Sequence, residues 1–149
     1  MPQAHRSIVI DVTPEQLVSV ITDFEKYPEF LPEVSKLTVT NRTDKSAEVH
    51  YEIEVIKKIK YSLRMDWQGE NGKYRIAWRL LNSDLLKKNE GAWELRPEGE
   101  GKTHADYSLD LQIGGFIPVP AAITNKLAEQ SLPALLNNFK TRAEKIYSK

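Results

Sequence analysis

The sequence contains no cysteine. A chain without cysteine has no disulfide framework, no thiolate nucleophile and no cysteine-based zinc or iron–sulfur centre. It also has only three histidines, His5, His50 and His104, which limits both metal binding and imidazole catalysis. The composition therefore leaves few groups for chemistry, and we expect neither a metal nor an organic cofactor.

The chain has no excess of charge of either sign and no long apolar run. Lys+Arg and Asp+Glu both number 21, so the net charge is zero and nucleic-acid binding through bulk positive charge is excluded. No apolar run approaches the roughly 18 residues that indicate a transmembrane helix. The first six residues lack the apolar core of a signal peptide. We therefore expect a cytoplasmic protein.

What the chain does contain is the composition of one ordinary globular domain. It has 149 residues, of which 40% are hydrophobic and 28% charged, and a chain of this length typically forms a single domain. No repeat, low-complexity tract or linker divides it. We expect one domain over residues 1–149.

Two short helices are predicted near the N-terminus, after a first strand over residues 7–11. The first helix begins at Thr13, because Thr13 and Gln16 have the spacing of a capping box and Pro14 suits the first helical position. The second lies between Tyr27 and Leu31. A long amphipathic helix over residues 121–147, kinked at Pro133, closes the chain.

Six further strands are predicted between these helices, over residues 36–41, 47–55, 59–67, 74–81, 85–96 and 102–113. Apolar residues alternate with charged ones along them, which is typical of antiparallel strands with one buried face and one wet face. Asn71-Gly72 predicts a tight hairpin. The alternation assigns His50, His104 and Asp106 to the wet face. The result is an α+β fold, in which a seven-stranded antiparallel sheet wraps around the C-terminal helix.

Two segments carry a resemblance to a known family. They are Asp23–Pro32, which reads DFEKYPEFLP, and Leu86–Leu95, which reads LKKNEGAWEL. With the order of elements, the chain resembles the START-like (SRPBCC) helix-grip superfamily, in its bacterial polyketide cyclase/dehydrase and coenzyme-Q-binding branch. The resemblance covers essentially the whole chain. It implies a hydrophobic-ligand pocket between the sheet and the C-terminal helix, but it does not imply one chemistry.

The predicted pocket consists of residues on the dry strand positions and on the C-terminal helix. Several are tyrosines and tryptophans, whose polar tips seek partners when they are buried. The same rings could instead simply fill the core. Asn89 is the polar candidate, for a ligand carbonyl or for a neighbouring backbone group. The predicted pocket residues are Tyr51, Ile53, Leu63, Met65, Trp67, Trp78, Asn89, Trp93, Tyr107, Leu109, Ile123 and Leu127.

The segment 114–120, which reads GGFIPVP, suggests a movable loop at the opening of the pocket. Its apolar side chains, Phe116, Ile117 and Val119, are candidates for a gate or for transient contact with a membrane. The alternative is a tight turn whose side chains tuck under the helix.

Three functions remain open at this point. The first is a binding or carrier protein for a hydrophobic small molecule of the quinone, isoprenoid or lipid type. The second is a polyketide cyclase or aromatase-type enzyme, which needs an acid or base facing the cavity; the alternation supplies none, so no catalytic residue is assigned and catalysis stays undecided. The third resembles the ribosome-association toxins and acts through a protein partner, with the basic clusters 57–60 and 87–88 as candidate contacts.

Overall fold

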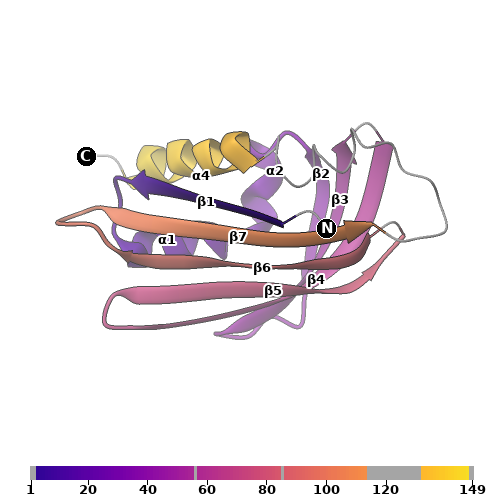
Figure 1. Cartoon of the computed structure of the whole chain (residues 1–149), viewed down its shortest axis with the longest axis horizontal. Coiled ribbons are helices and arrows are strands. Elements are labelled where there is room, and N and C mark those ends of the chain that lie inside the picture. The colour runs from indigo at the N-terminus through magenta and orange to yellow at the C-terminus, as the bar shows by residue number, and fades with distance from the viewer. Residues whose placement is uncertain (1–2, 56, 85, 114–131, 148–149) are drawn as a thin grey trace.

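A computed structural model of the chain describes residues 3–55, 57–84, 86–113 and 132–147 (Figure 1). The elements follow the predicted order, and η1 adds one turn directly before the second predicted helix. They are β1 (Gln3–Ile10), α1 (Pro14–Ile21), η1 (Phe24–Lys26), α2 (Tyr27–Phe30), β2 (Val34–Thr40), β3 (Ser46–Val55), β4 (Lys57–Glu70), β5 (Lys73–Ser83), β6 (Leu86–Pro97), β7 (Thr103–Ile113) and α4 (Leu132–Tyr147).

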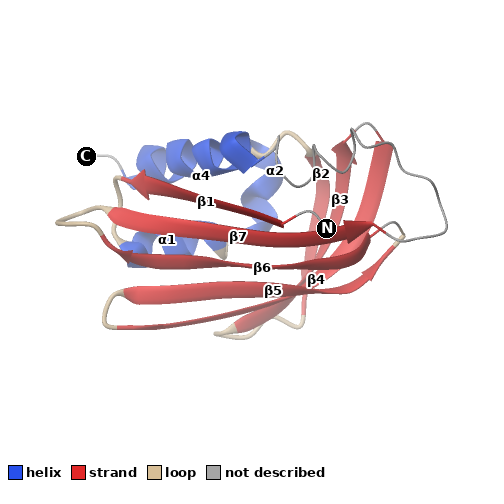
Figure 2. Ribbon diagram, in the orientation of Figure 1, coloured by secondary structure: helices blue, strands red, loops and turns tan. Residues whose placement is uncertain are grey.

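The seven strands form one antiparallel sheet in the order β1-β7-β6-β5-β4-β3-β2. The sheet is strongly curved, so that β2 and β3 stand at a steep angle to β5, β6 and β7 (Figure 1). The described helices lie on the concave side (Figure 2). This arrangement is the START-like helix-grip fold, and it confirms the predicted fold class.

Local sequence signals explain two local features, the start of α1 and the hairpin between β4 and β5. At the start of α1 the Gln16 backbone N–H donates to Thr13 Oγ1 at 3.2 Å, and the Thr13 N–H donates to Gln16 Oε1 at 3.0 Å, so the predicted capping box is present. Between β4 and β5, Asn71 and Gly72 have φ angles of 56° and 78°. Two positive φ values are those of the predicted tight hairpin.

The register of the strands confirms the wet and dry faces. On the wet face Glu52 of β3 lies opposite Lys60 of β4, and their charged atoms are 3.8 Å apart. On the dry face Val49 lies opposite Leu63, and both are buried. Opposite charges therefore pair across the strands on one side while apolar side chains meet on the other.

The two histidines on the wet face of the sheet have polar side chains within hydrogen-bond distance. His50 Nδ1 lies 2.7 Å from Ser62 Oγ, and its Nε2 lies 2.8 Å from Thr40 Oγ1. His104 Nε2 lies 3.2 Å from Asp106 Oδ1. Both histidines face outward as predicted, and hydroxyl and carboxylate neighbours lie within hydrogen-bond distance of their rings.

The C-terminal helix is described from Leu132 to Tyr147. Pro133 stands in the first turn of this described part, so the kink predicted there stays a prediction. The predicted gate residues Phe116, Ile117 and Val119, and the predicted pocket residues Ile123 and Leu127, lie outside the described residues. No described helix has both the length and the apolar character needed to cross a membrane.

The core lies between the concave face of the sheet and the helices. Where α1 and η1 cover the sheet, Leu17, Ile21 and Phe24 are completely buried against Ile10 and Ile76. The helix α4 crosses the same side and contacts α1 and β1. The remaining part of the concave face, under α2 and the first turns of α4, holds the cavity described next.

Candidate functional site

A cavity of about 230 Å³ lies between the concave face of the sheet, the segment joining α2 to β2, and α4. Strands β3 to β7 supply its floor and walls with side chains from their dry positions. The segment 31–34 and the first half of α4 line the other side. Its volume is somewhat below the usual range of about 300–1,000 Å³ for small-molecule sites, so it suits a compact ligand or part of a larger one.

Nine of the twelve predicted pocket residues line this cavity. Ile123 and Leu127 lie outside the described residues, and Trp67 is placed elsewhere. The ligand-binding role of the nine stays a prediction, because their placement shows only that they surround the same space. They are Tyr51, Ile53, Leu63, Met65, Trp78, Asn89, Trp93, Tyr107 and Leu109.

Trp67 is the one described pocket candidate that does not line the cavity. Its ring packs against Phe24 at a centroid distance of 5.9 Å, and the Arg42 guanidinium lies 5.7 Å from it. The alternation of β4 correctly places Trp67 on the dry face. It does not say how far along the strand the cavity extends, and the strand carries Trp67 beyond the cavity to the end covered by η1.

Sequence reasoning missed several lining residues on the helices and on the strands. Tyr27 belongs to α2, Leu31 follows it and Val34 begins β2, while Leu135 and Phe139 come from α4. Three strand residues, Tyr61, Leu86 and Leu111, were missed as well. The available signals were the Tyr-Pro segment that carried the family resemblance and the apolar stripe of the C-terminal helix. Neither signal says which of these side chains meets the sheet at the cavity.

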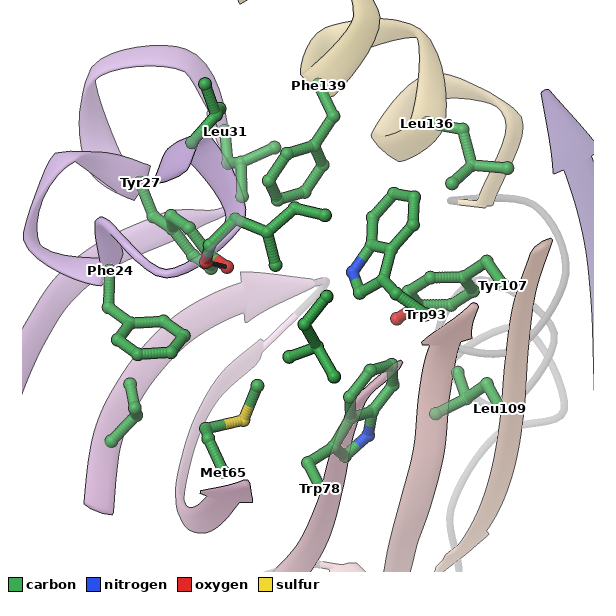
Figure 3. Close-up of a cluster of buried hydrophobic side chains, with 14 of the residues drawn as sticks. Phe24, Tyr27, Leu31, Met65, Trp78, Trp93, Tyr107, Leu109, Leu136 and Phe139 are labelled. Atoms are coloured by element: carbon green, nitrogen blue, oxygen red, sulfur yellow. Dashed lines mark hydrogen bonds between the residues drawn. The ribbon is translucent and has the colours of Figure 1, made fainter. Parts of the chain in front are cut away.

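Aromatic rings make up much of the wall, and they contact one another mainly edge to face. The Phe139 ring lies 5.2 Å from Trp93 and 5.3 Å from Tyr27, and Trp93 lies 4.9 Å from Tyr107. Figure 3 shows Phe139 entering from α4 above Trp93, with Tyr107 and Trp78 on the strands below. Edge-to-face contacts of this kind hold rigid rings in fixed positions.

A buried polar pair lies at the floor of the cavity. The Trp78 indole Nε1 donates a hydrogen bond to Asn89 Oδ1 at 3.0 Å, and both side chains are buried. The protein partner of Asn89 is therefore an indole rather than the backbone group that we considered. Nearby, Gly91 faces the Trp78 ring so closely that a Cβ at this position would collide with the ring and with the Ser108 carbonyl. Glycine at this position leaves room for the indole beside β6.

The phenols of the cavity are held in their neutral form. Burial raises the pKa values of Tyr27, Tyr51, Tyr61 and Tyr107 above the ordinary tyrosine value, because a phenolate is poorly solvated there. The Tyr27 hydroxyl donates to the Ile21 carbonyl. Neutral phenols can donate hydrogen bonds, but they do not serve as bases near neutral pH.

The described lining contains few groups that could take up a proton near neutral pH. Among these residues the only carboxylate belongs to Glu33, which comes from the segment between α2 and β2, and no histidine or lysine is present. General acid–base catalysis needs groups placed within hydrogen-bond reach of the reacting atoms. Among the described lining residues, Glu33 and the neutral phenols are the groups that could take part in proton transfer.

The sequence matches a known family and known proteins over most of its length. The sequence model of a family described as polyketide cyclase / dehydrase and lipid transport matches residues 10–140. The ribosome association toxin RatA of Vibrio cholerae is 25% identical over 148 residues, covering 99% of this chain and 99% of the toxin.

Solved structures share the fold at low sequence identity. The aromatase/cyclase Zhui from Streptomyces sp. R1128 has a TM-score of 0.86 at 14% identity, covering 98% of this chain and 96% of its own. The STAR-related lipid transfer protein from Xanthomonas axonopodis has a TM-score of 0.82 at 12% identity, covering 95% and 85%. Similarity at this level of identity establishes the fold alone.

Proposed function

The chain belongs to the polyketide cyclase / dehydrase and lipid transport family, and from that membership we propose that it binds a hydrophobic small molecule and carries it unchanged. The ligand lies in the cavity between the sheet and α4. The single observation that supports this is a cavity of about 230 Å³ lined mainly by apolar and aromatic side chains. The scarcity of titratable groups among the described lining residues, which include one carboxylate and no histidine or lysine, favours a carrier over a cyclase.

The expected affinity is modest. Burying about 300 Å² of apolar ligand surface at about 25 cal/mol per Å² contributes about 7 kcal/mol before any cost is subtracted. Loss of ligand freedom and ordering of side chains remove part of that gain. Micromolar or weaker binding follows, which suits a protein that must release its cargo.

The ligand class within this proposal is a quinone, an isoprenoid or an acyl-type lipid. Such molecules combine a large apolar surface with few polar atoms, as the lining does. Coenzyme Q as the ligand, a cytoplasmic location, and delivery through transient membrane contact belong to the same proposal.

Native mass spectrometry of protein purified from its own host tests the proposal. We expect a bound ligand that organic solvent extracts and that can be restored by adding the extract. The variant Leu109→Trp fills the cavity and should lose the ligand, whereas Trp67→Phe, which changes a ring outside the cavity, should keep it. If the wild type carries no ligand and binds no apolar probe, or if Leu109→Trp folds and still carries the ligand, the proposal is wrong.

A second candidate function, action through a protein partner, is favoured by the name of the Vibrio cholerae relative, a ribosome association toxin. The basic clusters considered for that contact are partly neutralised within the chain. Lys58 and Lys60 lie 3.9 Å and 3.8 Å from Glu52, and Lys88 lies 2.7 Å from Asp110. Sedimentation with ribosomes over a range of salt concentrations tests this candidate, and retention at physiological salt would support it.

A further inference from the structure

Asn89 presents to the cavity a hydrogen-bond donor that no described residue uses, while its acceptor oxygen already has a partner. Its side chain is only 7% exposed, and its Oδ1 is already occupied by the Trp78 indole. An indole N–H can only donate, so this contact fixes which end of the carboxamide is oxygen and which is nitrogen. Among the described residues nothing accepts a hydrogen bond from Nδ2, although Asn89 lines the cavity.

Trp93 supplies a second group that can only donate. Its side chain is 2% exposed and lines the cavity, and within the described part of the chain its Nε1 has no acceptor. The hydroxyl groups of Tyr51, Tyr61 and Tyr107 likewise have no hydrogen-bond partner among the described residues. These phenols keep their protons and so add donors, although each can also accept.

Groups that only accept are scarce on the same walls. The sheet backbone uses its carbonyl groups in the strand ladder, and the strands contribute no carboxylate or imidazole to the described lining. Glu33 and Asn138 bring acceptors, but they come from the segment 31–34 and from α4, on the other side of the cavity, and both are partly exposed. A ligand that approaches the strands with its own N–H or O–H groups would meet mainly donors.

The donors on the strands lie within one continuous set of side chains. The Trp78 ring, which holds Asn89 in place, lies 5.2 Å from the Tyr107 ring, and Tyr107 lies 4.9 Å from Trp93. Asn89 and Trp93 are both on β6, and Tyr107 is directly opposite Trp93 on β7. These donors therefore come from two neighbouring strands and line the same cavity.

We propose that the cavity selects an uncharged ligand that presents a hydrogen-bond-accepting oxygen, such as a ring carbonyl, to Asn89 Nδ2 and its neighbouring donors. This inference rests on the proposed function, since it specifies the chemistry of the ligand within the same cavity. A pure hydrocarbon of the same shape leaves these donors unpaired, and an unpaired buried donor is costly. The oxygen therefore supplies selectivity, while the apolar skeleton supplies the gross affinity.

Naphthoquinone and naphthalene test this selectivity, because they share one carbon skeleton and differ in two carbonyl oxygens. The absence of cysteine excludes thiol addition to the quinone. We expect isothermal titration to show that naphthoquinone binds about tenfold more tightly than naphthalene, which is the range of one net hydrogen bond. Equal binding of the two probes would overturn the inference and leave the proposed function standing. Binding of neither would contradict the proposed function itself.

Two variants assign the preference to Asn89. In Trp78→Phe the amide keeps its donor, so the preference for naphthoquinone should persist. In Trp78→Phe combined with Asn89→Leu no indole N–H is left without its acceptor, and the preference should fall to about equal binding while naphthalene affinity stays the same. An undiminished preference in the folded double variant would overturn the role of Asn89.

If thermal unfolding shows that the double variant does not fold, Trp93→Phe replaces it. This change removes the other group that only donates and keeps a ring in place. We expect the preference for naphthoquinone to fall about two- to fivefold, in line with the loss of part of the donor set. An unchanged preference in that variant would contradict the proposal.

Discussion

The two ends of the concave face are built from the same dry strand positions, yet one is filled and the other is hollow. At the filled end, under α1 and η1, Leu17, Phe24 and Ile76 are completely buried. At the hollow end, under α2 and the first turns of α4, Tyr51 and Tyr61 remain partly exposed around the cavity. Alternation alone does not distinguish the two ends.

The difference lies in the shape and polarity of the side chains. At the filled end aliphatic side chains such as Leu17, Ile21 and Ile76 are completely buried together with the Phe24 ring, which packs against Trp67. At the hollow end Tyr51 and Tyr61 stack at 4.8 Å, and other rings meet edge to face. Rigid rings adapt less readily to one another than aliphatic side chains do, and the cavity lies among them. A protein with one continuous dry face can therefore combine a packed core with a binding cavity.

Phe24→Ala should destabilise the filled end. Removal of a completely buried phenylalanine is expected to lower the free energy of unfolding by about 3–5 kcal/mol, because it leaves a void in a close-packed region. Urea unfolding measures this loss. The affinity of the folded protein for an apolar probe should not change, and a loss of affinity would mean that the two ends are coupled.

Alkaline pH should weaken the hollow end. Tyr27 and Tyr107 have pKa values raised by burial, so their contribution to stability is complete below pH 10, the ordinary tyrosine value, and is lost as the pH rises above it. The pKa values of Tyr51 and Tyr61 are raised in the same way, and four such groups imply a loss of up to about 5 kcal/mol per pH unit in that range. Urea unfolding at several pH values measures the slope, and Tyr107→Phe should reduce it by about a quarter. An unfolding free energy that stays constant above pH 10 would contradict this.

A matched pair of substitutions on β7 compares the two ends directly. Ala105, at the filled end, is completely buried, and Ala105→Leu should cost about 1–3 kcal/mol through overpacking. Leu109 lies on the same strand and the same face but lines the cavity, so Leu109→Phe should cost less than about 1 kcal/mol. Thermal unfolding of both variants tests the comparison. Equal costs would mean that the cavity is not available space.

His50→Gln should have the smallest effect. The imidazole bridges Ser62 and Thr40 on the outer face, and glutamine can replace part of this bridge. We expect a change in unfolding free energy within about 1 kcal/mol and no change in probe binding. His5→Gln, at an exposed position, serves as the control. A loss of probe binding in His50→Gln would show that the outer face affects the cavity.

The sequence by itself determined the local features of this protein. The Thr13 capping box and the Asn71-Gly72 hairpin depend on neighbouring residues alone, so the pattern sufficed to predict them. Alternation assigned each strand residue to a face, because the side-chain period of a strand is two. The same rule put nine of the predicted pocket residues at the cavity and kept His50 and His104 away from it.

The tertiary structure decided everything that depends on position along an element or on contact between distant elements. It moved Trp67 to the filled end, brought Tyr27 and Phe139 to the cavity, and paired Asn89 with Trp78. Sequence spacing carries no information on these points, because the curvature of the sheet and the placement of α4 depend on the packing of the whole core. The face of a residue is a local property, but its neighbour across a cavity is not.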